Sequence, residues 1–355
     1  MKIDPSPRFP LEIWGLVLRQ ATLNTNLQFL ENTDSRLRWK TKRNVVLVCK
    51  GWNVIAARFL CEHVSMTGLT AFNKFFDVFL QDKSARFERY TVRLDIPLET
   101  SQTSKRQQSR ASLFFDRLQI VLKGLPNLTV LCLSKSMQVD TQKWINILRD
   151  HSNLRAFGSP SLIGPREPPV HPQLHLPNLQ LLRITCPSHS MLYAQLPSTS
   201  FPKLRHLDLT VAGSISDIPF LQVHGRNLTT LHFFFNHPYY LPKKFGKGLQ
   251  TLCPNLRELF ADDLQRKFSH KLVQVLGIYL PLHLKKNQVS RFFGGLMGLK
   301  SNFPNLKVFR VLSSMDIRSQ SNRTYIIQFG VNRCKGIGVM IEDCDGQVMY
   351  APPGW

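Results

Sequence analysis

The sequence has few acidic residues and no long apolar run. Asp and Glu number 23 against 46 Lys and Arg, which leaves a formal charge of +23 on 355 residues. Such an excess favours acidic partners but does not determine a fold. No apolar run approaches the roughly 18 residues that a membrane-spanning helix needs, so we expect no membrane association. Because the first residues also lack the apolar segment of a signal peptide, we expect a cytoplasmic or nuclear location, or both.

The sequence also lacks clusters of metal-binding or catalytic residues. Its seven cysteines are scattered without a Cys-x-x-Cys pair, which argues against a disulfide framework and a structural zinc site. His171 and His175 are four residues apart, but Pro172 excludes the helical face that would align them as ligands. We find no Gly-rich phosphate loop and no Gly-x-Ser-x-Gly nucleophile elbow. We therefore expect no cofactor and no enzymatic activity of the chain itself.

What the sequence does contain is a short unit that recurs from about residue 87 onward. Each unit has an anchoring leucine, preceded by Asn in six of seven cases, and successive anchors are 26, 25, 25, 24, 28 and 50 residues apart. The last gap is twice 25, which predicts one degenerate repeat around Leu272–Leu282. The anchors are Leu128, Leu154, Leu179, Leu204, Leu228, Leu256 and Leu306.

The residues after each anchor follow the pattern Leu-x-x-Leu-x-apolar, as in Leu204-x-x-Leu207-x-Leu209. This is a strand alternation with one extra inward leucine, typical of leucine-rich repeats. Helical apolar periodicity follows between anchors, for example over Phe114–Leu125. One strand and one helix per repeat predict an α/β solenoid, a horseshoe with parallel strands on its concave side.

Two stretches interrupt the repeats, and a different pattern follows them. Glu99–Ser112 is polar and basic and predicts an exposed loop, whereas Gly158–His175 contains five prolines and predicts a protruding, non-helical segment. From Asn322 the sequence predicts a helix to Lys335, a strand over Ile337–Glu342 and a turn at Asp345-Gly346. We assign 67–316 to the solenoid and 317–355 to a C-terminal capping segment.

The first 66 residues predict a small helical domain. Phe9–Leu18 starts with a proline suited to the first helical position and has apolar residues at helical spacing. Asn44–Leu60 carries a longer helical stripe of eight apolar residues. Eight such side chains, at about 1.5–3 kcal/mol each, represent more burial than so small a unit can satisfy internally. We therefore predict that a partner covers this surface, although packing on the first repeat is the alternative.

Two motifs in this segment resemble the F-box, in the divergent form common in basidiomycete fungal proteins. They are Phe9-Pro10-x-Glu12-Ile13-x-x-x-Val17-Leu18 and Val48-Cys49-Lys50-Gly51-Trp52, and Leu60-x-x-x-Val64 resembles the closing segment. The resemblance implies docking on a Skp-type adaptor and, through it, on a cullin, with the repeats selecting an unknown target protein. It implies adaptor contacts, or packing behind them, by Phe9, Pro10, Leu11, Ile13, Val17, Leu18, Val48, Cys49, Trp52 and Leu60.

Clusters of basic residues allow another hypothesis, a repeat protein that binds nucleic acid or an acidic protein without a ligase role. Clusters occur at Arg36–Arg43, Lys105–Arg110, Lys243–Lys247 and Lys285-Lys286. None shows the interleaved aromatics of an RNA-recognition module, so nucleic acid is the less favoured partner. Phe233, Phe234 and Phe235 precede Tyr239 and Tyr240, and these rings form either an aromatic patch for a peptide or part of the core.

Overall fold

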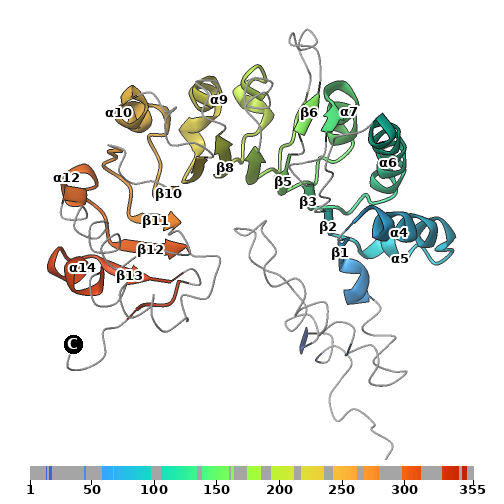
Figure 1. Cartoon of the computed structure of the whole chain (residues 1–355), viewed down its shortest axis with the longest axis horizontal. Coiled ribbons are helices and arrows are strands. Elements are labelled where there is room, and N and C mark those ends of the chain that lie inside the picture. Colours follow the sequence, from blue (N-terminus) through green and yellow to red (C-terminus); the bar gives the residue numbers. More distant parts are fainter. Residues whose placement is uncertain are drawn as a thin grey trace, which may run out of the picture. The chain divides into compact units, whose positions relative to one another are not determined.

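In the computed structural model the chain comprises two compact units. Their helices and strands are labelled in Figure 1. Unit 1 is Met1–Pro169 with Leu174–Leu179, and unit 2 is Val170–Gln173 with Gln180–Trp355. The main sheet has eleven parallel strands that follow chain order, and it is not closed. The structure describes residues 13, 16, 17, 44, 58–66, 68–96, 105–133, 138–159, 161–163, 174–184, 193–211, 217–235, 243–261, 268–279, 298–312, 330–343 and 346–349.

Unit 1 consists of parallel strands joined by helical crossovers. Its strands in the main sheet are β1 (His63–Ser65), β2 (Arg93–Ile96), β3 (Val130–Leu133) and β5 (Ala156–Gly158). Its helices are α4 (Leu69–Gln81), α5 (Arg86–Tyr90), α6 (Lys105–Lys123) and α7 (Thr141–Arg149). A separate two-stranded sheet pairs β4 (Gln138–Asp140) with β6 (Ser161–Ile163).

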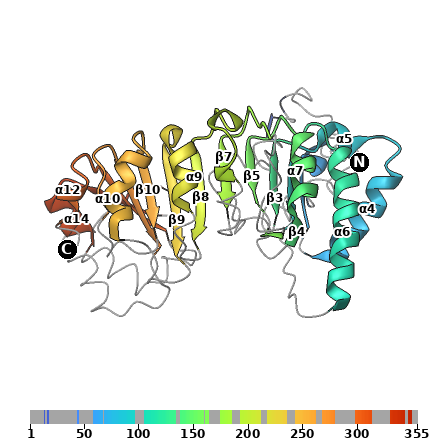
Figure 2. The same ribbon diagram turned by 90° about the horizontal axis from the view of Figure 1, so that it is seen from above.

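Unit 2 repeats the same plan, with its helices on one side of the strands (Figure 2). Its strands are β7 (Leu181–Ile184), β8 (His206–Val211), β9 (Thr230–Phe235), β10 (Glu258–Ala261), β11 (Val275–Tyr279), β12 (Val308–Leu312) and β13 (Met340–Glu342). Its helical segments are η1 (Ser198–Ser200), α9 (Asp217–His224), η2 (Gly225–Asn227), α10 (Lys243–Leu252), α12 (Leu299–Asn302) and α14 (Asn332–Gly336).

The core of each unit is a stack of equivalent apolar residues from successive strands. In unit 2 the parallel register places Leu207 beside Leu231 and Leu231 beside Leu259, and all three are fully buried. Leu94 and Leu131 form the corresponding row in unit 1. A single repeat cannot bury its leucines alone, so stacking supplies the core. The predicted α/β fold of the leucine-rich-repeat type is therefore confirmed.

The degenerate repeat predicted near Leu272–Leu282 is present as β11. Glu258 pairs with Val275, and Val275 pairs with Val308, so the gap of 50 residues is divided into 17 and 33 rather than evenly. In this register Val273 takes the place of the anchoring leucine, and it is fully buried. The anchor was hidden in the sequence because Val replaces Leu and no Asn precedes it.

The asparagine before most anchors connects each repeat to the preceding one. Asn153 donates a hydrogen bond from Nδ2 to the Pro126 carbonyl at 3.4 Å, and Asn178 donates to the Ser152 carbonyl at 3.2 Å. In unit 2, Asn255 and Asn305 donate to the carbonyls of Arg226 and Lys271, both at 2.8 Å. Each accepting residue lies in the turn of the neighbouring repeat. The Asn-Leu signature thus satisfies turn carbonyls that would otherwise depend on water.

Two sequence-based expectations differ from the structure, and a third is met in the residues described. The stretch expected as a loop over Glu99–Ser112 contains the start of α6 at Lys105, because its Lys, Arg and Gln residues are good helix formers even without apolar periodicity. The described part of the proline-rich stretch contains the strand β6 and, as expected, no helix. The last strand begins at Met340 rather than at Ile337, because Gly338, at φ 67°, ends the preceding helical segment in the left-handed region.

The structure describes parts of the first and last predicted segments. The turn expected near Asp345-Gly346 is confirmed, since the Gly346 amide donates to the Asp343 carbonyl at 3.1 Å. An antiparallel bridge between Glu342 and Val348 then pairs the outer side of β13. At the other end, β1 already belongs to the sheet, although it lies inside the segment 1–66. The division into three domains itself stays a prediction, and most of the helix expected from Asn322 lies outside the described residues.

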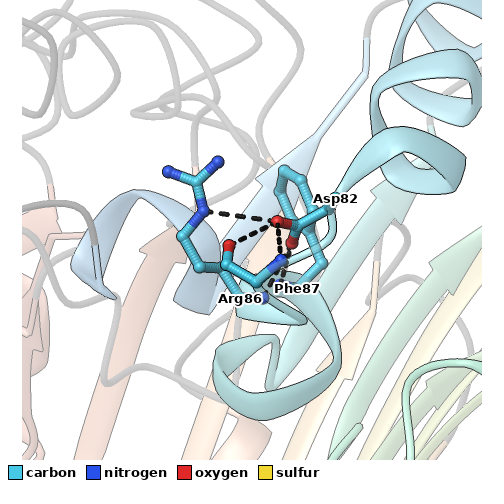
Figure 3. A network of polar contacts seen from close by, with 4 residues as sticks. Asp82, Arg86 and Phe87 are labelled. Atoms are coloured by element: carbon cyan, nitrogen blue, oxygen red, sulfur yellow. Dashed lines mark hydrogen bonds and ion pairs between the residues drawn. The ribbon is translucent and has the colours of Figure 1, made fainter.

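The connection between α4 and α5 is held by one carboxylate (Figure 3). Asp82 accepts hydrogen bonds from the backbone amides of Arg86 at 2.7 Å and Phe87 at 3.2 Å, and from the Ser84 hydroxyl at 2.6 Å. These bonds satisfy free amides at the start of α5. Burial acts to raise the pKa of Asp82, but the hydrogen bonds from Ser84, Phe87 and Arg86 outweigh it, so the pKa is lowered from 3.8.

We expect Asp82→Ala to destabilise the protein by about 1–2 kcal/mol, since the amides of α5 lose their acceptor. Because the folded-state pKa is lowered, this contribution is present above the ordinary value of 3.8 and disappears as the pH falls through the folded-state pKa. Urea unfolding at neutral pH measures the loss. Asp77→Ala, which removes an exposed carboxylate from α4, is the matched control. Equal losses in the two variants would contradict the capping role.

Candidate partner-binding surfaces

The predicted adaptor-binding residues are described only in part. Ile13 and Val17 are 43% and 51% exposed, and the neighbouring Leu16 is 62% exposed. All three have helical backbone, and their spacing places them on one helical face. Leu60 is helical and half-buried. The remaining members lie outside the described residues: Phe9, Pro10, Leu11, Leu18, Val48, Cys49 and Trp52.

The exposed face formed by Ile13, Leu16 and Val17 is the first candidate surface, and we call it the apolar face. Isolated exposed apolar side chains are common in soluble proteins, but three adjacent ones on a helix mark an interaction surface more often. Each of these three side chains retains a large exposed fraction, and packing of the segment on the first repeat stays the alternative for the residues outside the described part.

The second candidate surface is the face of the unit 2 strands opposite the core, which we call the open face. Side chains alternate across a strand, so residues between the buried leucines point to this face. On it, Asp208 is 3% exposed and accepts a hydrogen bond from Arg183 Nε at 3.1 Å. The other Asp208 oxygen lies 3.4 Å from His232 Nδ1. Beside them, Thr230 donates from its hydroxyl to Glu258 at 3.0 Å.

An aromatic contact extends this polar group along the open face. The His232 and Phe260 rings have centroids 4.2 Å apart. Phe260 in turn lies over Gly277, where a Cβ atom would come within 2.0 Å of Phe260 Cδ1. Gly277 is therefore needed to seat the ring, and the ring shields His232. Farther along, Arg310 donates from Nε at 3.0 Å and from Nη2 at 2.7 Å to the same oxygen of Glu342, Oε2.

Burial determines the charge of the two histidines on the open face. Desolvation lowers the pKa of His206, although Glu258 and Asp208 act to raise it. Desolvation also lowers the pKa of His232, against the opposing effect of Asp208. Both rings are therefore neutral at neutral pH and offer one donor and one acceptor each. Among the described residues, no group of three or more His, Cys, Asp or Glu side chains is arranged to hold a metal ion.

Unit 1 carries a similar arrangement on its own strands. Asp95 is 3% exposed, and its Oδ2 lies 2.7 Å from His63 Nε2. Arg93 Nε donates to both Asp95 oxygens at 3.0 Å. Like the open face of unit 2, this face carries paired charges and a histidine ring nitrogen bonded to a carboxylate.

Sequence analysis did not identify the polar residues on these strands. The signal was present, because His206 and Asp208 alternate with Leu207 and Leu209 just after an anchor. Of the aromatic residues expected to form either a peptide-binding patch or part of the core, Phe233 is fully buried in the core. Tyr239 and Tyr240 lie outside the described residues.

The described cysteines include two that are buried in the core. Cys253 and Cys334 are buried thiols, and burial raises the pKa of each to about 12. Such thiols pack as small apolar groups and are not nucleophiles at neutral pH. No helix in the described part of the chain combines the length and apolar composition needed to cross a bilayer.

Two solved structures resemble the chain at low sequence identity. The leucine-rich-repeat-containing protein LegL7 from Legionella pneumophila is similar in structure, with a TM-score of 0.42 and 12% identity, over 81% of this chain and 84% of that one. A chain of the yeast Rad7 and Elc1 complex is similar with a TM-score of 0.36 and 13% identity, over 75% and 68%. No family model and no curated protein sequence matches the chain.

Proposed function

We propose that the chain is the non-catalytic substrate-recognition subunit of an SCF-type cullin–RING ubiquitin ligase. In this proposal the first 66 residues dock on a Skp-type adaptor, which connects them to the cullin, and the repeats bind the target protein. Such a subunit would act in the cytoplasm, the nucleus or both. It would accelerate ubiquitin transfer by holding target lysines near the loaded enzyme, which raises their effective concentration.

The observation that carries the proposal is the apolar face in the segment with the two F-box-like motifs. Ile13 and Val17 are members of the first motif, and both remain exposed. A partner helix laid on this face would bury the side chains that the chain itself leaves in contact with water. The polar open face of the repeats supports a recognition role, since it presents fixed hydrogen-bonding groups rather than a catalytic group activated by its neighbours.

We expect Leu16→Asp/Val17→Asp to abolish retention of a Skp-type adaptor. A carboxylate pressed into an apolar interface loses its hydration, and two of them should weaken binding by a factor of at least 100. Co-purification of the adaptor with the full chain, followed by titration calorimetry, measures the loss. The two substituted side chains are exposed, so thermal stability should not change.

The matched control is Val78→Asp/Leu80→Asp on α4. These side chains are 51% and 60% exposed, close to the 51% and 62% of Val17 and Leu16. The control should retain the adaptor fully. An adaptor that does not bind the unmodified chain at micromolar concentration, or that binds both double variants equally, would refute the docking proposal.

A further inference from the structure

We propose that the edge of unit 2 where its strands begin binds an acidic segment of a partner protein. This basic edge comprises Arg205, Arg226, Arg257, Lys271 and Lys307. The inference deepens the proposed function and rests on it for one point, that the bound segment belongs to a ligase target. The binding itself requires only this chain and can be measured without an adaptor.

The basic edge places one exposed cation at the start of each of five successive strands. Arg205 directly precedes β8, Arg257 precedes β10 and Lys307 precedes β12. The strands between them take their cation from the turn a few residues earlier, Arg226 for β9 and Lys271 for β11. All five side chains are exposed. The residues are far apart in sequence, and only stacking of the repeats brings them into one row.

The first three positions of this row are fixed through their backbone carbonyls. The Arg205 carbonyl accepts from the Thr229 amide at 2.8 Å, and the Arg257 carbonyl accepts from the Gln274 amide at 2.7 Å. The Arg226 carbonyl accepts from Asn255 Nδ2 at 2.8 Å. The side chains are exposed, and their backbone carbonyls are hydrogen-bonded to the next repeat.

The same bonding continues to the end of the row. The Lys271 carbonyl accepts from Asn305 Nδ2, and the Lys307 carbonyl accepts from the Met340 amide, both at 2.8 Å. Neighbouring strands are about 4.8 Å apart, so five strands extend over about 19 Å. An extended peptide of about six residues has this length, at about 3.3 Å per residue. The spacing therefore suits a short acidic stretch.

The charge of the basic edge is not neutralised locally. The turns that lead into β8–β12 contain no Asp or Glu between residues 201–205, 225–229, 253–257, 268–274 or 303–307. Arg226, Arg257, Lys271 and Lys307 form no ion pair with another described residue. Glu258, at the start of β10, accepts instead from Thr230. A run of unpaired cations attracts a polyanion and accelerates its association.

The aromatic residues of this edge favour a peptide over nucleic acid. Binding of single-stranded nucleic acid relies on exposed rings on which bases stack. The rings in these turns are Phe201, Phe268 and Phe303, and they are only 2%, 2% and 1% exposed. The edge thus offers cations without stacking surfaces. Carboxylates of Asp and Glu need no such surface, since Arg and Lys recognise them through charge-assisted hydrogen bonds.

The test uses the full chain and a fluorescent peptide that contains six consecutive glutamates. In the edge variant, Arg226, Arg257, Lys271 and Lys307 are all replaced by Gln. Arg205 is kept because its Nη1 donates to the carbonyls of Leu204 and Asn227. We expect the dissociation constant, measured by fluorescence anisotropy at low salt, to rise by at least about tenfold, as the sum of four modest ion pairs.

The matched control removes the same charge from unit 1, through Lys74→Gln, Lys83→Gln, Arg89→Gln and Lys123→Gln, all exposed residues. It should change the dissociation constant less than twofold. Equal weakening by both variants, no binding by the unmodified chain, or tighter binding of a single-stranded oligonucleotide of equal charge would overturn the inference. Adaptor retention is measured separately on the unmodified chain. If the unmodified chain does not retain the adaptor, this result counts against the proposed function and not against peptide binding at the basic edge.

Discussion

Replacing Asp208 with Ala should destabilise unit 2 by about 3 kcal/mol. The carboxylate is 3% exposed and lies 3.0 Å from Arg183 Nη2, whose side chain is 15% exposed. Removal of one partner of a buried pair leaves the other charge desolvated without its counterion, which typically costs 3–5 kcal/mol. The residual exposure of Arg183 places the expected loss at the lower end. Urea unfolding followed by circular dichroism measures it.

Two further variants separate charge from packing. Asp208→Asn keeps the shape and one acceptor and should cost less than Asp208→Ala. Arg183→Met removes the cation, so the double variant Arg183→Met/Asp208→Ala should recover part of the loss. Additive losses in this cycle would show that the pair is not coupled. Loss of target binding by Asp208→Asn at unchanged stability would place the open face in the recognition surface.

Acidification should destabilise the protein below about pH 6.5, because several buried histidines resist protonation. Burial lowers the pKa of His151, His206, His224, His232 and His270 from 6.5. The unfolded chain therefore binds more protons than the folded one as the pH falls below 6.5, and stability falls with it. Each fully buried ring contributes a slope of up to about 1.4 kcal/mol per pH unit.

Two of these rings have a defined reason to stay neutral. His224 Nε2 donates to the Tyr193 carbonyl at 3.0 Å, while its buried Nδ1 has no hydrogen-bond partner. His270 Nε2 donates to the Cys253 carbonyl at 2.9 Å, and its Nδ1 accepts from the Leu272 amide at 3.2 Å. A proton on either Nδ1 would be left without an acceptor. His224→Gln should therefore flatten the dependence of stability on pH between 7.5 and 5.5, as measured by urea midpoints.

If stability depends on pH as steeply in His224→Gln and His270→Gln as in the unmodified chain, the two histidines do not cause the loss of stability in acid. The amide side chain of Gln can still donate to the carbonyl but does not titrate, so it tests protonation rather than packing. A loss of stability that is the same at every pH would show that the ring is needed only for its shape.

The repeats were predictable because their information is local and recurs. An anchor such as Leu228, followed by Leu231 and Phe233, reports a strand and its buried face within six residues. Errors arose where that local signal failed. Val273 replaces an anchor in the degenerate repeat, and Lys105 starts a helix without apolar periodicity. The adaptor-binding set was predicted from motif resemblance, and of its ten members Ile13, Val17 and Leu60 are described.

The basic edge, in contrast to the repeats, was not predictable from the sequence. The sequence clusters at Arg36–Arg43 and Lys243–Lys247 stand out because their members are adjacent, yet the row of Arg226, Arg257 and Lys271 has no two adjacent members. Its residues become neighbours only because parallel register places equivalent turns side by side. The same is true of Arg183, Asp208 and His232, each from a different strand.

From the order of its residues alone, the chain determines an α/β repeat fold, the spacing of most strands and the apolar residues that cover each other between repeats. Periodicity conveys these features because each repeat needs the same inward leucines. Only the tertiary structure decided which charges meet across strands, which histidines lose contact with water and which cations share an edge. Those relations depend on the register between strands 17 to 37 residues apart, which no single repeat encodes.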